Sequence, residues 1–354
     1  MIANARALKE DILPEELVHR GEKFDLLMTA LQSLDPDTLG DDARIYGPSG
    51  AGKTTMAKMA AREIEAQLMS VETAHVDCLS HSTTTAALHH LCASLEIDGG
   101  LAYRSSSVAE YRDALAGLDR PVLVLVDEAD HLDCLDLIHV LYELPHVATI
   151  TISNREESLL KRADDRTASR LRSGVRIQLD AYSDQQLVDI LERRVASGLV
   201  ENIVDDDALW AMARRSEGNA REAIWHLRFG IKHVRAGNAD RVTTGVVDET
   251  STLARADLVR KVFSRLDREH RVICEVLFEH GELGASELHD ELVSTLGESM
   301  SPRKRQRLET LGQMIWAVCR LDTIPLDTIF MINPEIMLTH TSVKLYSSIP
   351  AVLI

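Results

Sequence analysis

The chain has 354 residues, of which 45% are apolar and 27% are charged, and its formal net charge at pH 7 is −17. This length favours two or three domains, and the composition is that of a globular protein. The longest strongly apolar run, PVLVLV at 121–126, is far shorter than the roughly 20 residues of a membrane-spanning helix. The charged N-terminus is unlike a signal peptide, and five scattered cysteines indicate reduced thiols, so we expect a cytoplasmic protein with no membrane contact.

The first motif in chain order is a glycine-rich loop between a short apolar strand and an amphipathic helix, in ARIYGPSGAGKTTMAKMAAREIEAQ at 43–67. It matches the phosphate-binding pattern G-x-x-x-x-G-K-[ST] completely. Backbone N–H groups of such a loop surround phosphate oxygens, while the helix N-terminus and the lysine add positive charge. Thr54 is expected to ligate Mg²⁺. The nucleotide-binding residues predicted here are Gly47, Pro48, Ser49, Gly50, Ala51, Gly52, Lys53, Thr54 and Thr55.

A second apolar strand supplies the acidic half of the predicted site. PVLVLVDEADHLD at 121–133 begins as an uninterrupted apolar run, as a strand buried on both faces requires, and continues into Asp127 and Glu128. We expect Asp127 to hold Mg²⁺ together with Thr54, and Glu128 to orient or polarise the attacking water. ATP and Mg²⁺ are therefore the predicted cofactors.

The following segments resemble the AAA+ class of P-loop ATPases. The apolar strand VATITISN ends in Asn154, where the resemblance implies the polar residue called sensor 1, which contacts the γ-phosphate or the water. In DDRTASRLRSG, Arg170 stands in a Ser-Arg-apolar motif that presents an arginine finger to a neighbour's nucleotide, and Arg166 is the alternative finger. GNAREAIWHLR resembles a lid motif in which Arg221 reaches the phosphates as sensor 2. Taken singly, each arginine could form a surface salt bridge, but their order behind a P-loop favours the catalytic set.

From residue 10 to about 320 the chain resembles the archaeal origin-recognition and cell-division-control (Orc/Cdc) replication initiator family of AAA+ ATPases. The family-specific parts are LPEELVHR at 13–20, LYELPHVATITISNREE at 141–157 and RIQLDAYSDQQLVDIL at 176–191. The resemblance implies an α/β AAA+ core at 1–180, a helical lid at 181–250 and a winged-helix DNA-binding domain at 251–354. It also implies that four residues lie near the adenine base: Leu13, Pro14, His19 and Arg20.

The function implied by this resemblance is that of a DNA replication initiator. Such a protein binds double-stranded origin DNA, hydrolyses ATP slowly, and acts as an ATP-controlled switch that recruits the replicative helicase. Self-association, or contact with a paralogue, would use the arginine finger. The alternative is a regulatory or assembly ATPase whose C-terminal module binds proteins or promoters.

A helical insertion before Asp127 contacts DNA in this family, and residues 80–115 are its equivalent here. They contain only two basic residues, Arg104 and Arg112, so the sequence leaves open whether that contact is retained. The adjacent His89 and His90 point to different sides of a helix, which favours packing or surface roles over metal ligation.

The C-terminal third contains a basic cluster in SPRKRQRLE at 301–309, where Ser301 is a plausible helix N-cap and Pro302 suits the first turn. Basic side chains near a helix N-terminus are unfavourable by up to ~1 kcal/mol each, so an external anion is the expected compensation. DNA phosphate at a recognition helix is favoured over an exposed face or another partner. The predicted DNA-binding residues are Arg303, Lys304, Arg305 and Arg307.

The tail at 321–354 departs from the family pattern, which places a β-hairpin wing here. Only four of its 34 residues are charged, and it contains no glycine. It is a divergent wing, a partner-binding segment or the product of an altered reading frame.

The basic residues are unevenly divided, with 30 Arg against 9 Lys, beside 56 acidic residues. This composition resembles that of proteins from salt-loving archaea, in which high salt screens the repulsion between acidic groups. An acidic protein from a mesophile is the alternative.

Overall fold

The computed structural model describes residues 12–14, 16–32, 41–68, 70–97, 103, 105–199, 202–251, 272, 276 and 285–296. The chain divides into two compact units, Met1–Thr250 and Ser251–Ile354. The division of the first unit into a core and a lid at residue 180 stays a prediction. No helix in the described ranges is long and apolar enough to cross a membrane.

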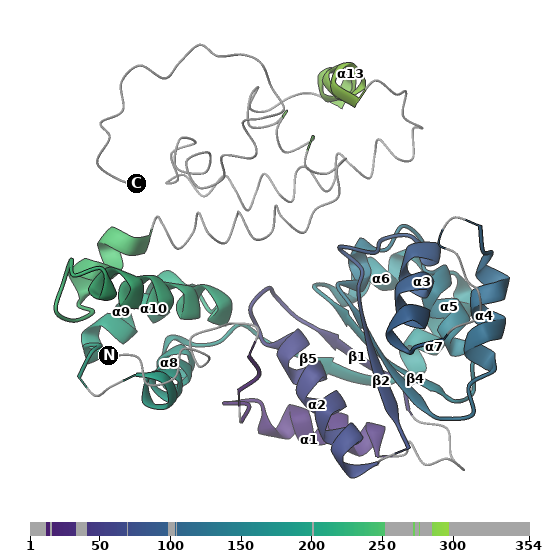
Figure 1. Ribbon diagram of the computed structural model, residues 1–354, viewed down its shortest axis with the longest axis horizontal. Helices are drawn as coiled ribbons and strands as arrows, with labels where there is room; N and C mark the ends of the chain where they lie inside the picture. Colours follow the sequence, from purple (N-terminus) through teal and green to yellow (C-terminus); the bar gives the residue numbers. More distant parts are fainter. Residues whose placement is uncertain are drawn as a thin grey trace. The chain divides into compact units, whose positions relative to one another are not determined.

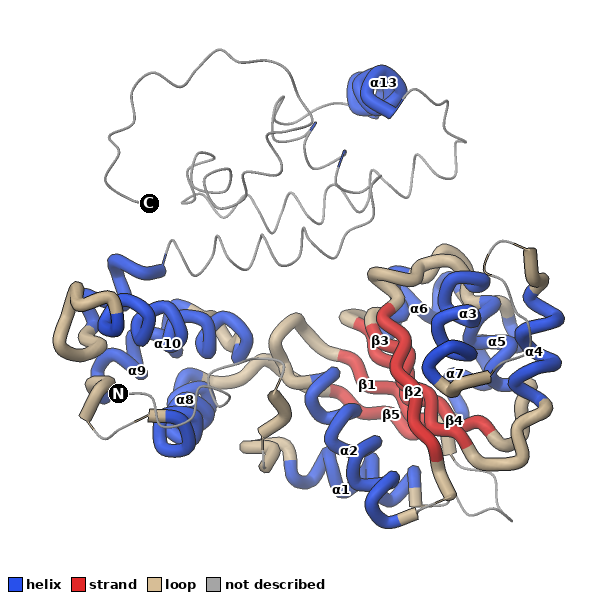
Figure 2. Tube along the Cα trace, viewed as in Figure 1, coloured by secondary structure: helices blue, strands red, loops and turns tan. Residues whose placement is uncertain are grey.

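The centre of the first unit is a five-stranded sheet in the order β2-β3-β4-β1-β5 (Figure 2). Every neighbouring pair is parallel. All residues of β1 and β3 are buried, as expected for apolar strands covered on both faces. The strands are β1 (Ala43–Tyr46), β2 (Glu72–Asp77), β3 (Val122–Asp127), β4 (Val147–Ser153) and β5 (Val175–Gln178).

Helices cover both faces of this sheet (Figure 1). One face packs against α1 (Gly21–Leu31) and α2 (Lys53–Gln67). The other face carries α3 (Thr84–Ser94), α4 (Val108–Ala116), α5 (Asp136–Tyr142), α6 (Glu156–Arg162) and α7 (Asp165–Ser173). Together with the sheet they form the three-layer α/β core that the sequence predicts.

The strand order brings the predicted site together. β4 lies between β1 and β3, and the three strands run in one direction. Their carboxyl ends therefore meet at one edge of the sheet, where the P-loop follows β1, Glu128 follows β3 and Asn154 follows β4. Ligand sites of open parallel sheets occur at this edge.

A separate apolar core holds the three helices α8 (Asp184–Gly198), α9 (Asp206–Arg215) and α10 (Ala220–Arg235). α8 begins with a capping box, in which the Ser183 hydroxyl and the Gln186 side chain each accept a backbone N–H of the other residue. Asn219 caps α10 by accepting the N–H groups of Arg221 and Glu222. The sequence predicts a helical lid at 181–250, and the three helices α8, α9 and α10 are called the lid below.

The second unit contains α13 (Ala285–Leu296). The basic cluster at 303–307 and the tail at 321–354 lie outside the described residues. The winged helix stays a prediction.

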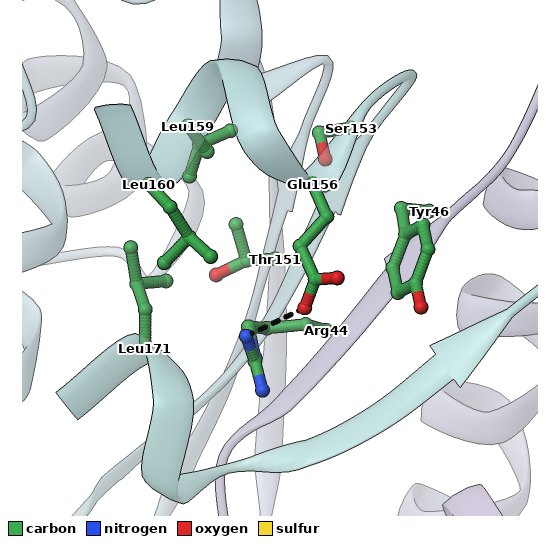
Figure 3. A pocket seen from close by; sticks show the side chains of 8 residues that line it. All are labelled: Arg44, Tyr46, Thr151, Ser153, Glu156, Leu159, Leu160 and Leu171. Atoms are coloured by element: carbon green, nitrogen blue, oxygen red, sulfur yellow. Dashed lines mark hydrogen bonds and ion pairs between the residues drawn. The ribbon is translucent and has the colours of Figure 1, made fainter. Parts of the chain in front are cut away.

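A charged side chain interrupts the apolar strand β1. Arg44 is buried, and its NH1 lies 3.0 Å from Oε1 of Glu156, the first residue of α6. Its NH2 donates to the carbonyl oxygens of Arg172 and Gly174, where α7 ends. Figure 3 shows this pair beside a small pocket lined by leucines of α6 and α7. Arg44 therefore ties the strand that leads into the P-loop to both helices.

Replacing Glu156 with alanine should lower the free energy of unfolding more than replacing Arg176, the second arginine that pairs with Glu156. Glu156→Ala leaves the Arg44 charge buried without its carboxylate, and the expected loss in the free energy of unfolding is about 3 kcal/mol. Arg176→Ala removes a more exposed pair with the same Glu156, and its expected loss is below about 1 kcal/mol. Urea denaturation measures both variants, and equal losses would contradict the central role of Arg44.

Candidate nucleotide-binding site

The P-loop holds a buried ammonium group. Gly52 (φ 92°) adopts the left-handed conformation that starts α2, and Lys53, only 6% exposed, is the first residue of that helix. Lys53 Nζ donates to the carbonyl oxygens of Gly47 at 2.8 Å and Pro48 at 3.0 Å, and to Asn154 Oδ1 at 3.0 Å. Burial lowers the pKa of Lys53, and the carboxylates of three nearby acidic residues oppose that shift. The positive charge of Lys53 in this loop is therefore only partly compensated by its hydrogen-bond partners and the nearby carboxylates.

Asp127, at the end of β3, is buried and hydrogen-bonded through both carboxylate oxygens. Its Oδ1 accepts from Thr54 Oγ1 and from the Glu128 backbone N–H, both at 3.1 Å. Its Oδ2 lies 3.2 Å from His75 Nε2. A carboxylate beside a hydroxyl is a set of hard oxygen ligands, which suits Mg²⁺. The residues predicted to hold the metal are thus in contact with each other.

Asn154 joins the basic and acidic halves of the site. Its Oδ1 accepts from Lys53, and its Nδ2 donates to Glu128 Oε2 at 3.1 Å. Asp130 Oδ2 accepts from the backbone N–H of Asn154 at 3.3 Å and from its Nδ2 at 3.4 Å. The Asn154 side chain is therefore fixed by hydrogen bonds to Lys53, Glu128 and Asp130.

Glu128 occupies a special backbone position. Its φ of 54° lies in the left-handed region, which costs energy for a residue with a side chain. Burial raises the pKa of Glu128, and the neighbouring charge of Asp127 raises it further. The carboxyl group predicted to act on water is thus placed by a turn rather than by a helix or strand.

The lid contacts the P-loop directly. The backbone N–H of Ala220, at the start of α10, donates to the Gly50 carbonyl oxygen at 3.2 Å. A methyl group on Gly50 would lie 1.9 Å from Asn219 Oδ1, so only glycine allows this approach. Arg221 follows at once, and its positive charge adds to the lowering of the Lys53 pKa. The predicted sensor 2 arginine therefore lies in the first turn of the helix that meets the loop.

The segment before α1 joins the P-loop to the lid. Arg20 NH2 donates to the carbonyl oxygens of Asp180 at 2.6 Å and Ala51 at 3.3 Å, and its guanidinium lies 4.0 Å from the Tyr182 ring centre. His19 Nε2 lies 2.6 Å from Asp189 Oδ2 on α8. These two residues thus have structural partners here, Leu13 and Pro14 are half-buried, and the adenine contact of all four stays a prediction.

Both candidate arginine fingers lie on α7 and contact the C-terminal end of α5. Arg166 forms an ion pair with Glu143 at 3.7 Å, and Arg170 donates to the Tyr142 carbonyl oxygen. Both side chains are exposed. Their action on a neighbour's nucleotide stays a prediction.

Sequence reasoning missed three residues that shape the site: His75, Asp130 and Asn219. Asp130 could have been suspected, because it follows Glu128 by two residues. Asn219 carries a signal as well, since asparagine before a helical run is a good N-cap. His75 carries no local signal, because its contact depends on the pairing of β2 with β3.

Comparisons with known proteins identify the family of the chain. A model of the AAA domain family matches residues 43–162. "ORC1-type DNA replication protein 9" of Halobacterium salinarum is 32% identical over 311 residues, which cover 88% of this chain and 87% of that protein. The chain belongs to the ORC1-type DNA replication protein family. A second relative, "ORC1-type DNA replication protein 1" of the same organism, is 29% identical over 82% of this chain and 94% of its own length.

Solved structures share the fold of this ORC1-type protein. The Aeropyrum pernix ORC1 protein, solved in complex with DNA, has a TM-score of 0.69 at 22% identity and covers 89% of this chain and 88% of its own. The Aeropyrum pernix ORC2 protein has a TM-score of 0.64 at 18% identity, with coverage of 88% and 90%. The halobacterial relatives also fit the acidic, lysine-poor composition of this ORC1-type chain.

Replacing Gly50 with alanine should weaken nucleotide binding. The new methyl group would meet Asn219 and force the P-loop and the start of α10 apart. Isothermal titration calorimetry should show ATP affinity reduced roughly 10-fold, which corresponds to the loss of about one hydrogen bond to a charged group.

Gly237→Ala is the matched control. Gly237 has a φ of 81°, close to the 75° of Gly50, but a methyl group there meets nothing within 4 Å. Both variants carry a similar backbone cost of about 1 kcal/mol, whereas only Gly50→Ala should lose affinity. Equal ATP affinity in the two variants would refute the contact argument.

Proposed function

We propose that this ORC1-type chain binds ATP with Mg²⁺ at the carboxyl edge of its sheet and uses the bound nucleotide as a switch in DNA replication initiation. The observation that carries the proposal is the hydrogen-bonded series of Lys53, Asn154 and Glu128, next to the contact of Thr54 with Asp127. These residues lie at the carboxyl ends of two strands, β3 and β4, and at the start of α2 after the P-loop.

Each residue then has a role in phosphoryl transfer. Lys53 exchanges its loop carbonyls for the terminal phosphates, because an anion compensates its buried charge better than neutral dipoles do. Thr54 and Asp127 would hold Mg²⁺, which neutralises charge on the phosphate oxygens. Glu128 orients the attacking water, and Asn154 keeps that carboxyl group in line with Lys53. Arg221 adds positive charge from the lid.

Hydrolysis is proposed to be slow, so that the ATP-bound form is the signal. The side chain of Asn154 donates a hydrogen bond to Oε2 of Glu128, and this bond restrains the carboxyl group that is proposed to orient the water. An arginine from α7 of a second copy or a paralogue, Arg170 or Arg166, would complete the site.

The proposed partner of the C-terminal unit is double-stranded origin DNA. Family membership and the DNA complex of the Aeropyrum pernix ORC1 protein support it. Within this unit, the basic cluster at 303–307 is the proposed phosphate contact, because it stands out in a chain of net charge −17. Recruitment of the replicative helicase would follow from the ATP-bound state at the origin.

Two variants separate ATP binding from hydrolysis. Lys53→Met should lower ATP affinity roughly 10- to 100-fold, because it removes charge-assisted hydrogen bonds to phosphate. Glu128→Gln should keep ATP affinity while the hydrolysis rate falls about 100-fold or more. Calorimetry and single-turnover hydrolysis measure the two effects. Undiminished hydrolysis by Glu128→Gln would assign the water-orienting role to another residue.

Removing the basic cluster should lower the affinity for DNA and make that affinity less dependent on salt concentration. A variant with glutamine at Arg303, Lys304, Arg305 and Arg307 loses four phosphate contacts, so the slope of log K against log salt should become shallower by roughly 3 to 4. Fluorescence anisotropy on duplex DNA over a range of KCl concentrations measures this slope.

The control removes the same charge elsewhere, with glutamine at four exposed residues of the first unit: Lys23, Arg62, Arg214 and Arg235. An equal change of slope would mean that total charge, rather than the cluster, governs binding.

A map of chromosomal binding sites then tests whether the protein binds at replication origins. Sites at replication starts support initiation, whereas sites at promoters support the regulatory alternative.

A further inference from the structure

His75 is a polar residue on the edge strand β2 whose side chain reaches the centre of the site. β2 pairs with β3 in the register Asp77↔Asp127, so His75 lies two residues before the position opposite Asp127. Residues two apart on a strand share a face, and a diagonal neighbour is within reach of a long side chain. His75 Nε2 accordingly lies 3.2 Å from Asp127 Oδ2.

The direction of this hydrogen bond follows from chemistry. An ionised carboxylate only accepts hydrogen bonds, so Nε2 of His75 carries the hydrogen and donates it. The other oxygen, Oδ1, already accepts from Thr54 and from the Glu128 backbone N–H. The two oxygens of Asp127 are thus distinguished: one faces β2 and the other faces the P-loop threonine.

His75 is itself supported from behind. The backbone of His75 lies beside the side chain of His90, on α3. The rings of His90 and His81 are stacked, with centroids 4.3 Å apart. This packing of α3 against β2 fixes the backbone from which the His75 ring extends.

We propose that His75 is a positioning residue for the Mg²⁺ that accompanies ATP. By holding Oδ2, it fixes the rotation of the Asp127 carboxylate and leaves Oδ1 directed toward Thr54 as the metal ligand. Partners that orient a ligating carboxylate typically change metal affinity about 10- to 100-fold when removed. This inference rests on the proposed MgATP site and adds a residue that the P-loop pattern does not contain.

The test measures metal affinity rather than turnover. ATP is titrated calorimetrically into the full chain at a series of free Mg²⁺ concentrations, and the Mg²⁺ concentration that gives half of the full gain in ATP affinity is recorded. His75→Phe should raise this midpoint about 10- to 100-fold and leave ATP affinity in EDTA unchanged. His75→Gln, whose amide can still donate, should stay within about 3-fold of the wild type.

Two controls make the result specific. His81→Phe keeps an aromatic ring beside His90, does not contact Asp127 and should leave the midpoint unchanged. If His75→Phe does not fold, His75→Asn replaces it, because the shorter amide does not reach Oδ2. The inference is overturned if a folded variant without the donor keeps a Mg²⁺ midpoint within about 2-fold of the wild type. A histidine with a purely structural role would lower stability without changing this midpoint. Failure of the wild-type chain to bind ATP overturns the proposed function and the inference with it.

Discussion

The buried ammonium of Lys53 is the constraint on which the site depends. A charge removed from water is costly unless it is compensated, and here two loop carbonyls and the Asn154 amide give only neutral compensation. The carboxylates that oppose the lowering of its pKa lie on the next strand but one, at the end of β3. The strand order β3-β4-β1 therefore sets the distance between the Lys53 ammonium and the acidic residues near the end of β3.

The P-loop is also held from outside the sheet. Arg20 reaches it from the segment before α1, and the N-terminus of α10 reaches it through Gly50. Arg20 also bonds the Asp180 carbonyl oxygen, so one guanidinium spans the loop and the chain that leads into the lid. The loop is thus joined to the lid by direct contacts as well as through the sheet.

Most of the core could be predicted because its signals are local. The P-loop and the acidic end of β3 are contiguous patterns, and the elements that carry them were expected from the stretches 43–67 and 121–133. The contacts of Arg44 and His75 could not be predicted, because they depend on which strands and helices become neighbours. The partners of Arg20 were missed for the same reason: Asp180 is 160 residues away in sequence.

The left-handed backbone at Glu128 has an evolutionary consequence. Glycine would occupy that conformation without the strain of about 1 kcal/mol that a side chain brings, so the fold alone would not select a glutamate there. If Glu128 acts on water as proposed, its presence here is a case of stability given up for function. In relatives that no longer need a reactive carboxyl group, we expect glycine or asparagine at this position. The residue found at this turn would then indicate whether a relative still hydrolyses nucleotide.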